Sequence, residues 1–156
     1  MRQQLTIDYN EFNSLNDLPP DEMTLMTNAM DATKGAYAPY SNFRVGAALQ
    51  LSNGLIVQGS NQENMAYPSG LCAERTAIFA ASARYPEFRE YRALAIVGCN
   101  AKGEYCEASP CGACRQVLME YEQNQGHPIK VLCYLNGGHV RVFNSVADLL
   151  PFSFDF

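Results

Sequence analysis

The sequence predicts an α/β fold in which helices cover a five-stranded sheet. Segments with apolar residues at helical spacing alternate with short β-like segments, in the order α-β-β-α-β-α-β-β. Short turns at residues 52–54 and 136–138 each contain glycine, and they indicate two antiparallel strand pairs. A chain of 156 residues fits one compact domain.

The first segment of the chain differs from the rest. Residues 1–17 read as an N-terminal extension, with a domain expected over residues 18–156. Apolar residues alternate at positions 5, 7 and 9, which is a weak strand pattern. The first helix is expected to begin at the two prolines before Asp21, because a helix start tolerates proline and favours an acidic residue. It is expected to end near residues 35–37, before another proline.

The later elements follow from composition and spacing. Cys114, Val117, Leu118 and Tyr121 lie at helical spacing, and another segment is rich in alanine. Further helices are expected at residues 72–84 and 111–122, a short last helix at 146–150, and strands at 43–51, 55–58, 93–99, 129–135 and 139–143. Residues 100–109 show no recognisable element.

Charge and hydropathy exclude several kinds of partner. The net charge is −5, and the eleven Lys and Arg residues form no basic run, so long nucleic acid is not an expected partner. No stretch approaches the roughly 20 apolar residues of a membrane span, and the first residues do not form a signal peptide. We therefore expect a cytoplasmic protein with an uncharged small substrate. Charged residues make up only 17% of the chain, which favours an oligomer with additional buried surface.

Six cysteines in a chain of this length indicate metal ligands better than a disulfide framework. Three of them lie in two short motifs, which are Cys72-Ala73-Glu74 and Pro110-Cys111-Gly112-Ala113-Cys114. Three thiolates leave one corner of a tetrahedral zinc site for water, as in catalytic zinc sites. The alternative ligands are the two histidines and the three remaining cysteines, namely His127, His139, Cys99, Cys106 and Cys133.

Two residues beside Cys72 suggest how such a site would work. Glu74 can be a helix-capping carboxylate, but next to a metal-activated water it can also move protons. Arg75 can be a solvated helix residue, or it can donate hydrogen bonds to a ligand sulfur. Three thiolates carry excess negative charge on one Zn²⁺, and helix starts at Cys72 and Cys111 would help to offset it.

At this point the sequence resembles the tetrameric cytidine deaminase family. The resemblance covers residues 18–154, and the matching segments are YAPYSNFRVGAAL at 37–49, NQEN at 61–64, YPSGLCAERTA at 67–77, SPCGACRQ at 109–116 and LLP at 149–151. It implies a three-layer α/β/α fold with a mixed five-stranded sheet. It also implies Zn²⁺ held by Cys72, Cys111 and Cys114, with Glu74 as the catalytic proton shuttle.

The resemblance implies substrate-binding residues as well. Asn61 and Glu63 are similar to ribose ligands, Phe43 to a wall against the nucleoside, and Ala73 is also placed in the substrate site. Tyr67 and a C-terminal phenylalanine resemble groups that complete a neighbouring subunit's site; Phe154 is preferred over Phe152. From the residues alone, Asn61 remains readable as a turn residue, Glu63 as a loop charge and Phe43 as a core strand residue.

The expected activity is hydrolytic deamination of cytidine and deoxycytidine to uridine and deoxyuridine in pyrimidine salvage, by a homotetramer with shared active sites. One alternative is a related zinc deaminase acting on a nucleotide, an aminonucleoside or a polynucleotide. Another is a zinc module without catalysis. Glu63 would repel a nearby phosphate, and a purely structural zinc site does not need Glu74, so both alternatives are disfavoured.

Overall fold

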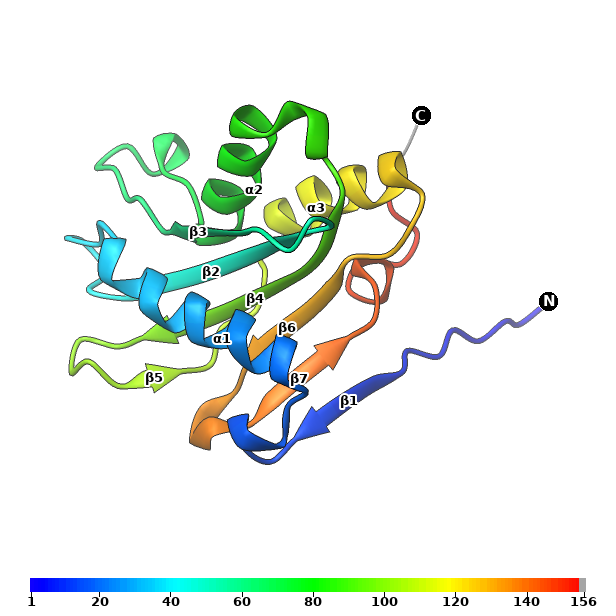
Figure 1. Cartoon of the computed structure of the whole chain (residues 1–156), viewed down its shortest axis with the longest axis horizontal. Coiled ribbons are helices and arrows are strands. Elements are labelled where there is room, and N and C mark those ends of the chain that lie inside the picture. Colours follow the sequence, from blue (N-terminus) through cyan, green and yellow to red (C-terminus); the bar gives the residue numbers. More distant parts are fainter. Residues whose placement is uncertain (155–156) are drawn as a thin grey trace.

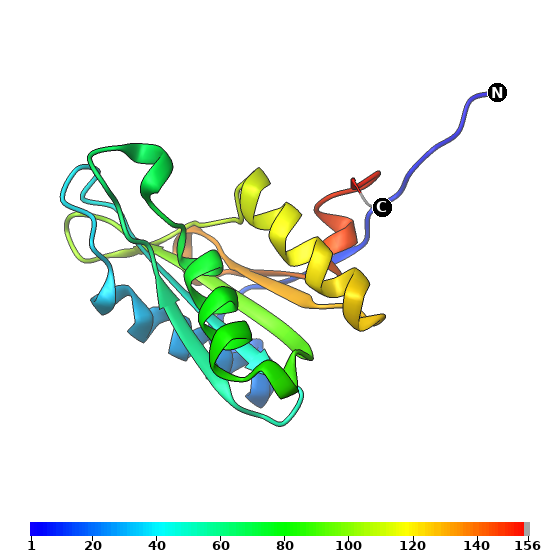
Figure 2. The ribbon, with the colours of Figure 1, turned by 90° about the horizontal axis from the view of Figure 1, so that it is seen from above.

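A computed structural model describes residues 1–154 of the chain. Within these residues, seven strands form one mixed sheet with helices on both faces, which confirms the predicted α/β class and its three layers (Figure 1). Helix α1 (Pro20–Ala32) covers one face of the sheet. Helices α2 (Ala73–Arg84) and α3 (Gly112–Gln125) cover the other face (Figure 2).

The strands follow the order β1-β7-β6-β4-β2-β3, and β5 pairs with β4 beside this path. Strands β4 and β6 are parallel, because α3 crosses over between them, and the other pairs are antiparallel. Both predicted antiparallel pairs, β2 with β3 and β6 with β7, are confirmed. The strands are β1 (Tyr9–Phe12), β2 (Arg44–Leu51), β3 (Ile56–Ser60), β4 (Tyr91–Cys99), β5 (Tyr105–Cys106), β6 (Lys130–Tyr134) and β7 (Val140–Phe143).

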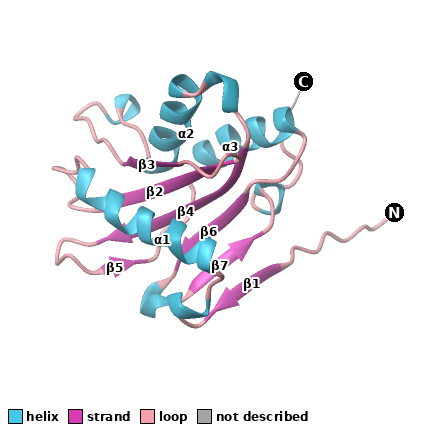
Figure 3. Cartoon of the chain, viewed as in Figure 1, coloured by secondary structure: helices cyan, strands magenta, loops and turns pink. Residues whose placement is uncertain are grey.

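The expectation of five strands is wrong, because two short strands depend on partners far away in the sequence. Strand β1 lies at the end of the pattern of alternating apolar residues and pairs with β7 (Figure 3). In this pairing, Tyr9 lies opposite Phe143. Glu11 also forms a 2.8 Å ion pair with Arg141. Strand β5 lies within residues 100–109, where no element was expected, and pairs with the end of β4.

Short 3-10 helices connect several of these elements. One continues α1 from Thr33 to Gly35, so the helical segment ends where the sequence predicts. The expected last helix is a single 3-10 turn, Val146–Asp148. The remaining 3-10 helices are Leu15–Asp17, Tyr67–Ser69, Pro86–Phe88 and Asn136–Gly138.

The core consists of two apolar layers, one on each side of the sheet. Alternate residues of the central strands point to opposite layers: Leu49 and Ile96 lie under α2 and α3, whereas Ala48 and Ala95 lie under α1. Helix α2 approaches β3 closely at Gly59. A β-carbon on this glycine would lie 2.4 Å from the backbone nitrogen of Ala77. The glycine therefore fixes the start of α2 close to the sheet.

Candidate active site

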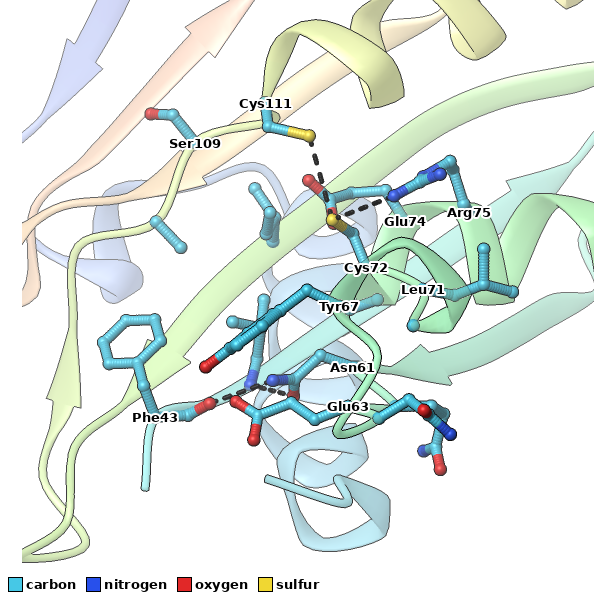
Figure 4. A pocket seen from close by; sticks show the side chains of 17 residues that line it. Phe43, Asn61, Glu63, Tyr67, Leu71, Cys72, Glu74, Arg75, Ser109 and Cys111 are labelled. Carbon is cyan, nitrogen blue, oxygen red and sulfur yellow. Dashed lines mark hydrogen bonds between the residues drawn. The ribbon is translucent and has the colours of Figure 1, made fainter. Parts of the chain in front are cut away.

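A cavity of about 470 Å³ opens at the start of α2 and α3. It is lined by the entry to β2, the long connection between β3 and α2 together with the first turn of α2, the segment before α3, and Ile96 of β4 (Figure 4). Almost all residues predicted for the site lie here, although they are distributed along the sequence. Those lining the cavity are Phe43, Asn61, Glu63, Tyr67, Cys72, Ala73, Glu74, Arg75 and Cys111.

Three cysteine sulfurs meet at the inner end of this cavity. Cys72 immediately precedes α2, Cys111 immediately precedes α3, and Cys114 lies in the first turn of α3. The sulfur of Cys111 lies 3.7 Å from that of Cys72 and 3.6 Å from that of Cys114. Sulfurs that each lie about 2.3 Å from a tetrahedral Zn²⁺ are separated by about 3.8 Å, so the spacing fits this ion.

Among the described residues, these three cysteines form the one group of three or more metal-binding side chains whose ligand atoms lie within 4.8 Å of one another. All six cysteines are free thiols. The alternative ligands considered from the sequence, which include Cys99, Cys106 and Cys133, are not members of this group. The chain thus provides three soft sulfur ligands at a pocket wall, which suits zinc with one position left open.

The surroundings of Cys72 favour its thiolate form. Hydrogen bonds from Cys114 and Arg75 lower the pKa of Cys72 to about 5, against the opposing effect of burial. The hydrogen bond to Cys72, together with burial, raises the pKa of the Cys114 thiol. The guanidinium Nη2 of Arg75 lies 3.4 Å from the Cys72 sulfur (Figure 4). The positive charge of Arg75 therefore lies directly beside one of the three sulfurs.

Glu74 is a buried carboxyl group beside these sulfurs. Only 3% of the residue is exposed, and it lies in the first turn of α2, two positions after Cys72. Burial raises the pKa of Glu74 to about 7, and the nearby Cys72 adds to the shift. A carboxyl group with this pKa can both accept and donate a proton near neutral pH. It is therefore suited to general acid–base chemistry at the inner end of the cavity.

Asn61 and Glu63 hold the opposite wall of the cavity through the backbone of residues 40–45. The Asn61 side chain accepts a 2.7 Å hydrogen bond from the Val45 N–H and donates a 2.9 Å bond to the Phe43 carbonyl oxygen. One Glu63 oxygen, Oε2, accepts from the N–H groups of Tyr40 and Ser41, at 2.9 and 3.3 Å. The other, Oε1, accepts from the Ser41 hydroxyl.

These contacts leave limited hydrogen-bonding capacity for a ligand. The Asn61 amide retains one free N–H and one free lone pair, and Oε1 of Glu63 retains a lone pair. The Ser41 hydroxyl is the main group that lowers the pKa of Glu63, so the carboxylate is ionised at neutral pH. The two side chains can thus offer one donor and one acceptor to the same hydroxyl group.

The aromatic residues of the site differ in their placement. Phe43 and Tyr67 line the cavity, and the Tyr67 ring is exposed and lies 6.4 Å from the ring of Tyr40. Phe154 lies outside the lining of this chain's own cavity and is 66% exposed. Phe152 lines a different hollow near the end of α3. Within residues 1–154, the single chain therefore brings Phe43 and Tyr67 to the site but not Phe152 or Phe154.

The structure adds residues that the sequence did not single out as site residues. Ser41 contacts Glu63, and its place in the matching segment around Phe43 was the available signal. Ser109 lines the cavity, and its place directly before Pro110 and Cys111 was a similar signal. The other additional lining residues are Val45, Gln62, Asn64, Gly70, Leu71, Ile96 and Ala108.

The sequence of this chain matches a known family model and curated proteins of that family. The family model described as "Cytidine and deoxycytidylate deaminase zinc-binding region" matches residues 20–125, which contain all three cysteines. The cytidine deaminase of Halalkalibacterium halodurans is 39% identical over 137 residues, which cover 86% of this chain and 94% of that protein. The cytidine deaminase of Sporosarcina psychrophila is 42% identical over 134 residues, covering 86% and 91%.

Solved structures of cytidine deaminases are also similar to this chain in both fold and sequence. The cytidine deaminase of Burkholderia pseudomallei superimposes with a TM-score of 0.72 at 43% identity and covers 84% of this chain and 97% of its own. The cytidine deaminase of Mycobacterium tuberculosis gives a TM-score of 0.69 at 34% identity, with 88% and 100% covered. Within residues 1–154, no helix has both the length and the apolar character of a membrane span.

Proposed function

This chain belongs to the zinc-binding cytidine and deoxycytidylate deaminase family, and we propose that it catalyses the hydrolytic deamination of cytidine and deoxycytidine. The products are uridine or deoxyuridine and ammonia. One observation carries this proposal: three cysteine sulfurs cluster at zinc-binding distances, and two of them, from Cys72 and Cys111, line a cavity together with a buried carboxyl group whose pKa is about 7.

In the proposed site, Cys72, Cys111 and Cys114 hold Zn²⁺. When bound, the zinc supplies an activated water for attack on C4 of the cytosine ring. Glu74 would move one proton of the attacking water to N3 of the cytosine ring and the other to the amino group, so that the C4–N bond breaks and ammonia leaves. Arg75 and the helix starts before α2 and α3 offset the negative charge of the three sulfurs.

The sugar and base would occupy the rest of the cavity. We assign the sugar hydroxyl to Asn61 and Glu63, supported by the one donor and one acceptor that these side chains keep available. Phe43 forms the wall beside the nucleoside, and Tyr67 and Ala73 also contribute to the substrate site. An ionised Glu63 disfavours a phosphorylated sugar, which supports a nucleoside over a nucleotide as the substrate.

The alternative of a zinc module without catalysis is less well supported. A structural zinc site is closed by four protein ligands, whereas this group has three and adjoins a cavity. Burial of Glu74 without a catalytic use would only cost stability, because burial disfavours its charged form. Both features favour the enzyme.

The proposal includes an assembly and a cellular role. We propose a homotetramer in which Phe154 completes a neighbouring subunit's site, and in which Tyr67 lines its own chain's cavity and also reaches the neighbouring subunit; their exposure of 69% for Tyr67 and 66% for Phe154 supports this. The catalytic domain spans residues 18–156, of which 155–156 lie outside the described residues, and residues 1–17 are an extension. Six free cysteines support a reducing cytoplasm, where the enzyme would serve pyrimidine salvage.

The decisive experiment is to incubate the purified, zinc-loaded protein with cytidine and to measure uridine and ammonia together. Zinc content and X-ray absorption at the zinc edge should give one ion per chain with three sulfur ligands. Stoichiometric uridine and ammonia would support the proposal. A zinc-loaded sample that forms neither product, or a spectrum with histidine nitrogen ligands, would overturn it.

A further inference from the structure

The backbone of residues 40–45, at one wall of the cavity, is held in place by hydrogen bonds to the side chains of Asn61 and Glu63. Residues 40–45 carry Phe43 to the cavity, and Asn42 adopts a left-handed backbone with φ of 55° within this loop. Asparagine adopts this conformation more readily than other non-glycine residues, and it turns the chain sharply between Ser41 and Phe43. The Asn61 amide lies on one side of this turn and the Glu63 carboxylate on the other.

The Ser41 hydroxyl connects these two parts of the wall. Its Oγ donates its hydrogen to Oε1 of Glu63 and accepts a 3.0 Å hydrogen bond from the N–H of Phe43. The Phe43 carbonyl oxygen is more distant from Oγ, at 3.4 Å. A hydroxyl has one hydrogen to donate, so the closer carboxylate receives it.

Because of this geometry, a single oxygen of Glu63 remains for a ligand. Oε2 already accepts from two backbone N–H groups, which together occupy its two lone pairs. Oε1 accepts only from Ser41, so one lone pair stays free toward the cavity that Glu63 lines. The hydrogen bond from the Ser41 hydroxyl to Oε1 and the two backbone bonds to Oε2 together orient that lone pair.

We propose that Ser41 is a positioning residue for the sugar end of the substrate. Its hydroxyl orients the Glu63 carboxylate toward a sugar hydroxyl and, through the same oxygen, tethers the Phe43 backbone at the wall of the cavity. This proposal rests on the proposed function, because it uses Glu63 as the sugar ligand. Ser41 itself lies outside the lining of the cavity and acts through Glu63 and Phe43.

The effect of Ser41 should fall on binding rather than on chemistry. Its contacts are confined to the wall of residues 40–45 and to Glu63, and none of them involves the three cysteines or Glu74. Loss of a hydrogen bond to a charged group weakens binding by about tenfold or more. In Ser41→Ala we expect KM for cytidine to rise about tenfold while kcat stays close to that of the unchanged enzyme.

The test compares three substitutions at this position in the zinc-loaded enzyme. Ser41→Ala removes the hydroxyl, Ser41→Cys keeps a similar shape with a weak donor, and Ser41→Thr keeps the hydroxyl. We expect KM to rise in the Ala and Cys variants and to be largely restored in the Thr variant. Ser82→Ala is the matched control. Ser82 lies in the last turn of α2, away from the cavity, and its hydroxyl accepts a 2.9 Å hydrogen bond from the Arg89 side chain.

A double-substitution cycle then separates positioning from general loop stability. If Ser41 acts through Glu63, Ser41→Ala should add little to KM in a Glu63→Gln background. Affinity for the product uridine, measured by calorimetry without turnover, should fall in parallel with the rise in KM. An unchanged KM in both Ser41→Ala and Ser41→Cys, or fully additive effects in the cycle, would overturn the inference. If the unchanged enzyme forms no uridine from cytidine, the proposed function fails instead.

Discussion

The ring of Phe43 occupies the space into which a side chain on Gly98 would project. A β-carbon built on Gly98 would lie 2.6 Å from Cζ of Phe43 and 3.1 Å from the sulfur of Cys106. The position of the Phe43 ring, and with it the width of the cavity at this wall, therefore depends on the absence of a side chain at Gly98.

Gly98→Ala should displace the Phe43 ring toward the cavity, because the backbone of β4 is paired on both sides and cannot move easily. Overpacking of this kind typically costs about 1–3 kcal/mol. We expect KM for cytidine to rise about tenfold with zinc content unchanged. Steady-state kinetics and metal analysis check this. The double variant Phe43→Leu with Gly98→Ala should bind like Phe43→Leu alone, and a further loss in the double variant would contradict the explanation.

Glu74→Gln keeps the shape of the side chain but removes its ability to accept a proton. Because general acid–base groups contribute at least about 10²-fold, turnover should fall by this amount or more. Zinc content and uridine affinity should remain close to those of the unchanged enzyme. Turnover near the normal rate in a zinc-loaded Glu74→Gln protein would exclude the proton-shuttle role.

The same substitution should stabilise the metal-free protein at neutral and higher pH. The pKa of Glu74 is about 7 in the folded chain, above its ordinary value, so the folded state holds a proton that the unfolded state releases. Stability therefore falls as the pH rises from about 4.5 to 7, by at most about 3 kcal/mol, and the glutamine variant escapes this loss.

Urea unfolding of both metal-free proteins, with reductant present, measures this difference. At pH 8 the Glu74→Gln protein should be the more stable of the two, and near pH 4.5 the two should be similar. The thiols of Cys72 and Cys114 interact with the Glu74 carboxyl group, so part of the measured difference is the loss of this interaction in the glutamine variant. Equal stability at both pH values would show that the Glu74 carboxylate is well solvated in the folded state.

Arg75→Ala removes the guanidinium that lies 3.4 Å from the Cys72 sulfur. Groups that contact metal ligands typically contribute about 10- to 100-fold in affinity or activity, so zinc should dissociate faster or turnover should fall by this factor. Competition with a chelator measures zinc retention. Arg84→Ala, in the last turn of the same helix, serves as the control. Unchanged retention and turnover in Arg75→Ala would make Arg75 an ordinary helix residue.

Activity should depend on assembly, because Phe154 lies outside its own chain's cavity. Dilution that dissociates the tetramer should lower activity although each chain keeps its three cysteines and Glu74. Removal of residues 151–156 should raise KM more than it changes zinc content. Light scattering across a dilution series, with cytidine turnover measured on the same samples, checks this. A monomer with full activity would require that each site be complete within one chain.

The helices and central strands could be predicted because their signals are local. The prolines before Asp21 mark the start of α1, and the glycine turns mark both antiparallel pairs. Strand β5 has only two residues, too few for any periodic pattern. The register of β1 is set by its pairing with residues about 130 positions away, such as the Glu11 partner Arg141, which periodicity in the sequence cannot reveal.

The cysteine cluster and Glu74 could be predicted from the sequence, whereas the hydrogen bonds that hold residues 40–45 could not. Cysteine spacing on two helix starts and Glu74 beside Cys72 pointed directly to a metal centre with a proton-transfer group. The predicted β2–β3 hairpin brings residues 40–45 close to Asn61 and Glu63. It does not determine which backbone groups these two side chains bind, so their hydrogen bonds could not be predicted from the sequence. Only the structure shows that the Ser41 hydroxyl contacts both Glu63 and the Phe43 backbone.

The N-terminal strand has a consequence for solubility. Strand β7 would be the outer strand of the sheet without β1, and its unpaired backbone N–H and C=O groups would be open to pairing with another chain. Strand β1 satisfies these groups and presents Asn10 and Glu11 at the new edge, where a charge discourages further pairing. A chain shortened to the segment that matches the family would therefore expose an aggregation-prone edge while its cluster of three cysteines remained intact.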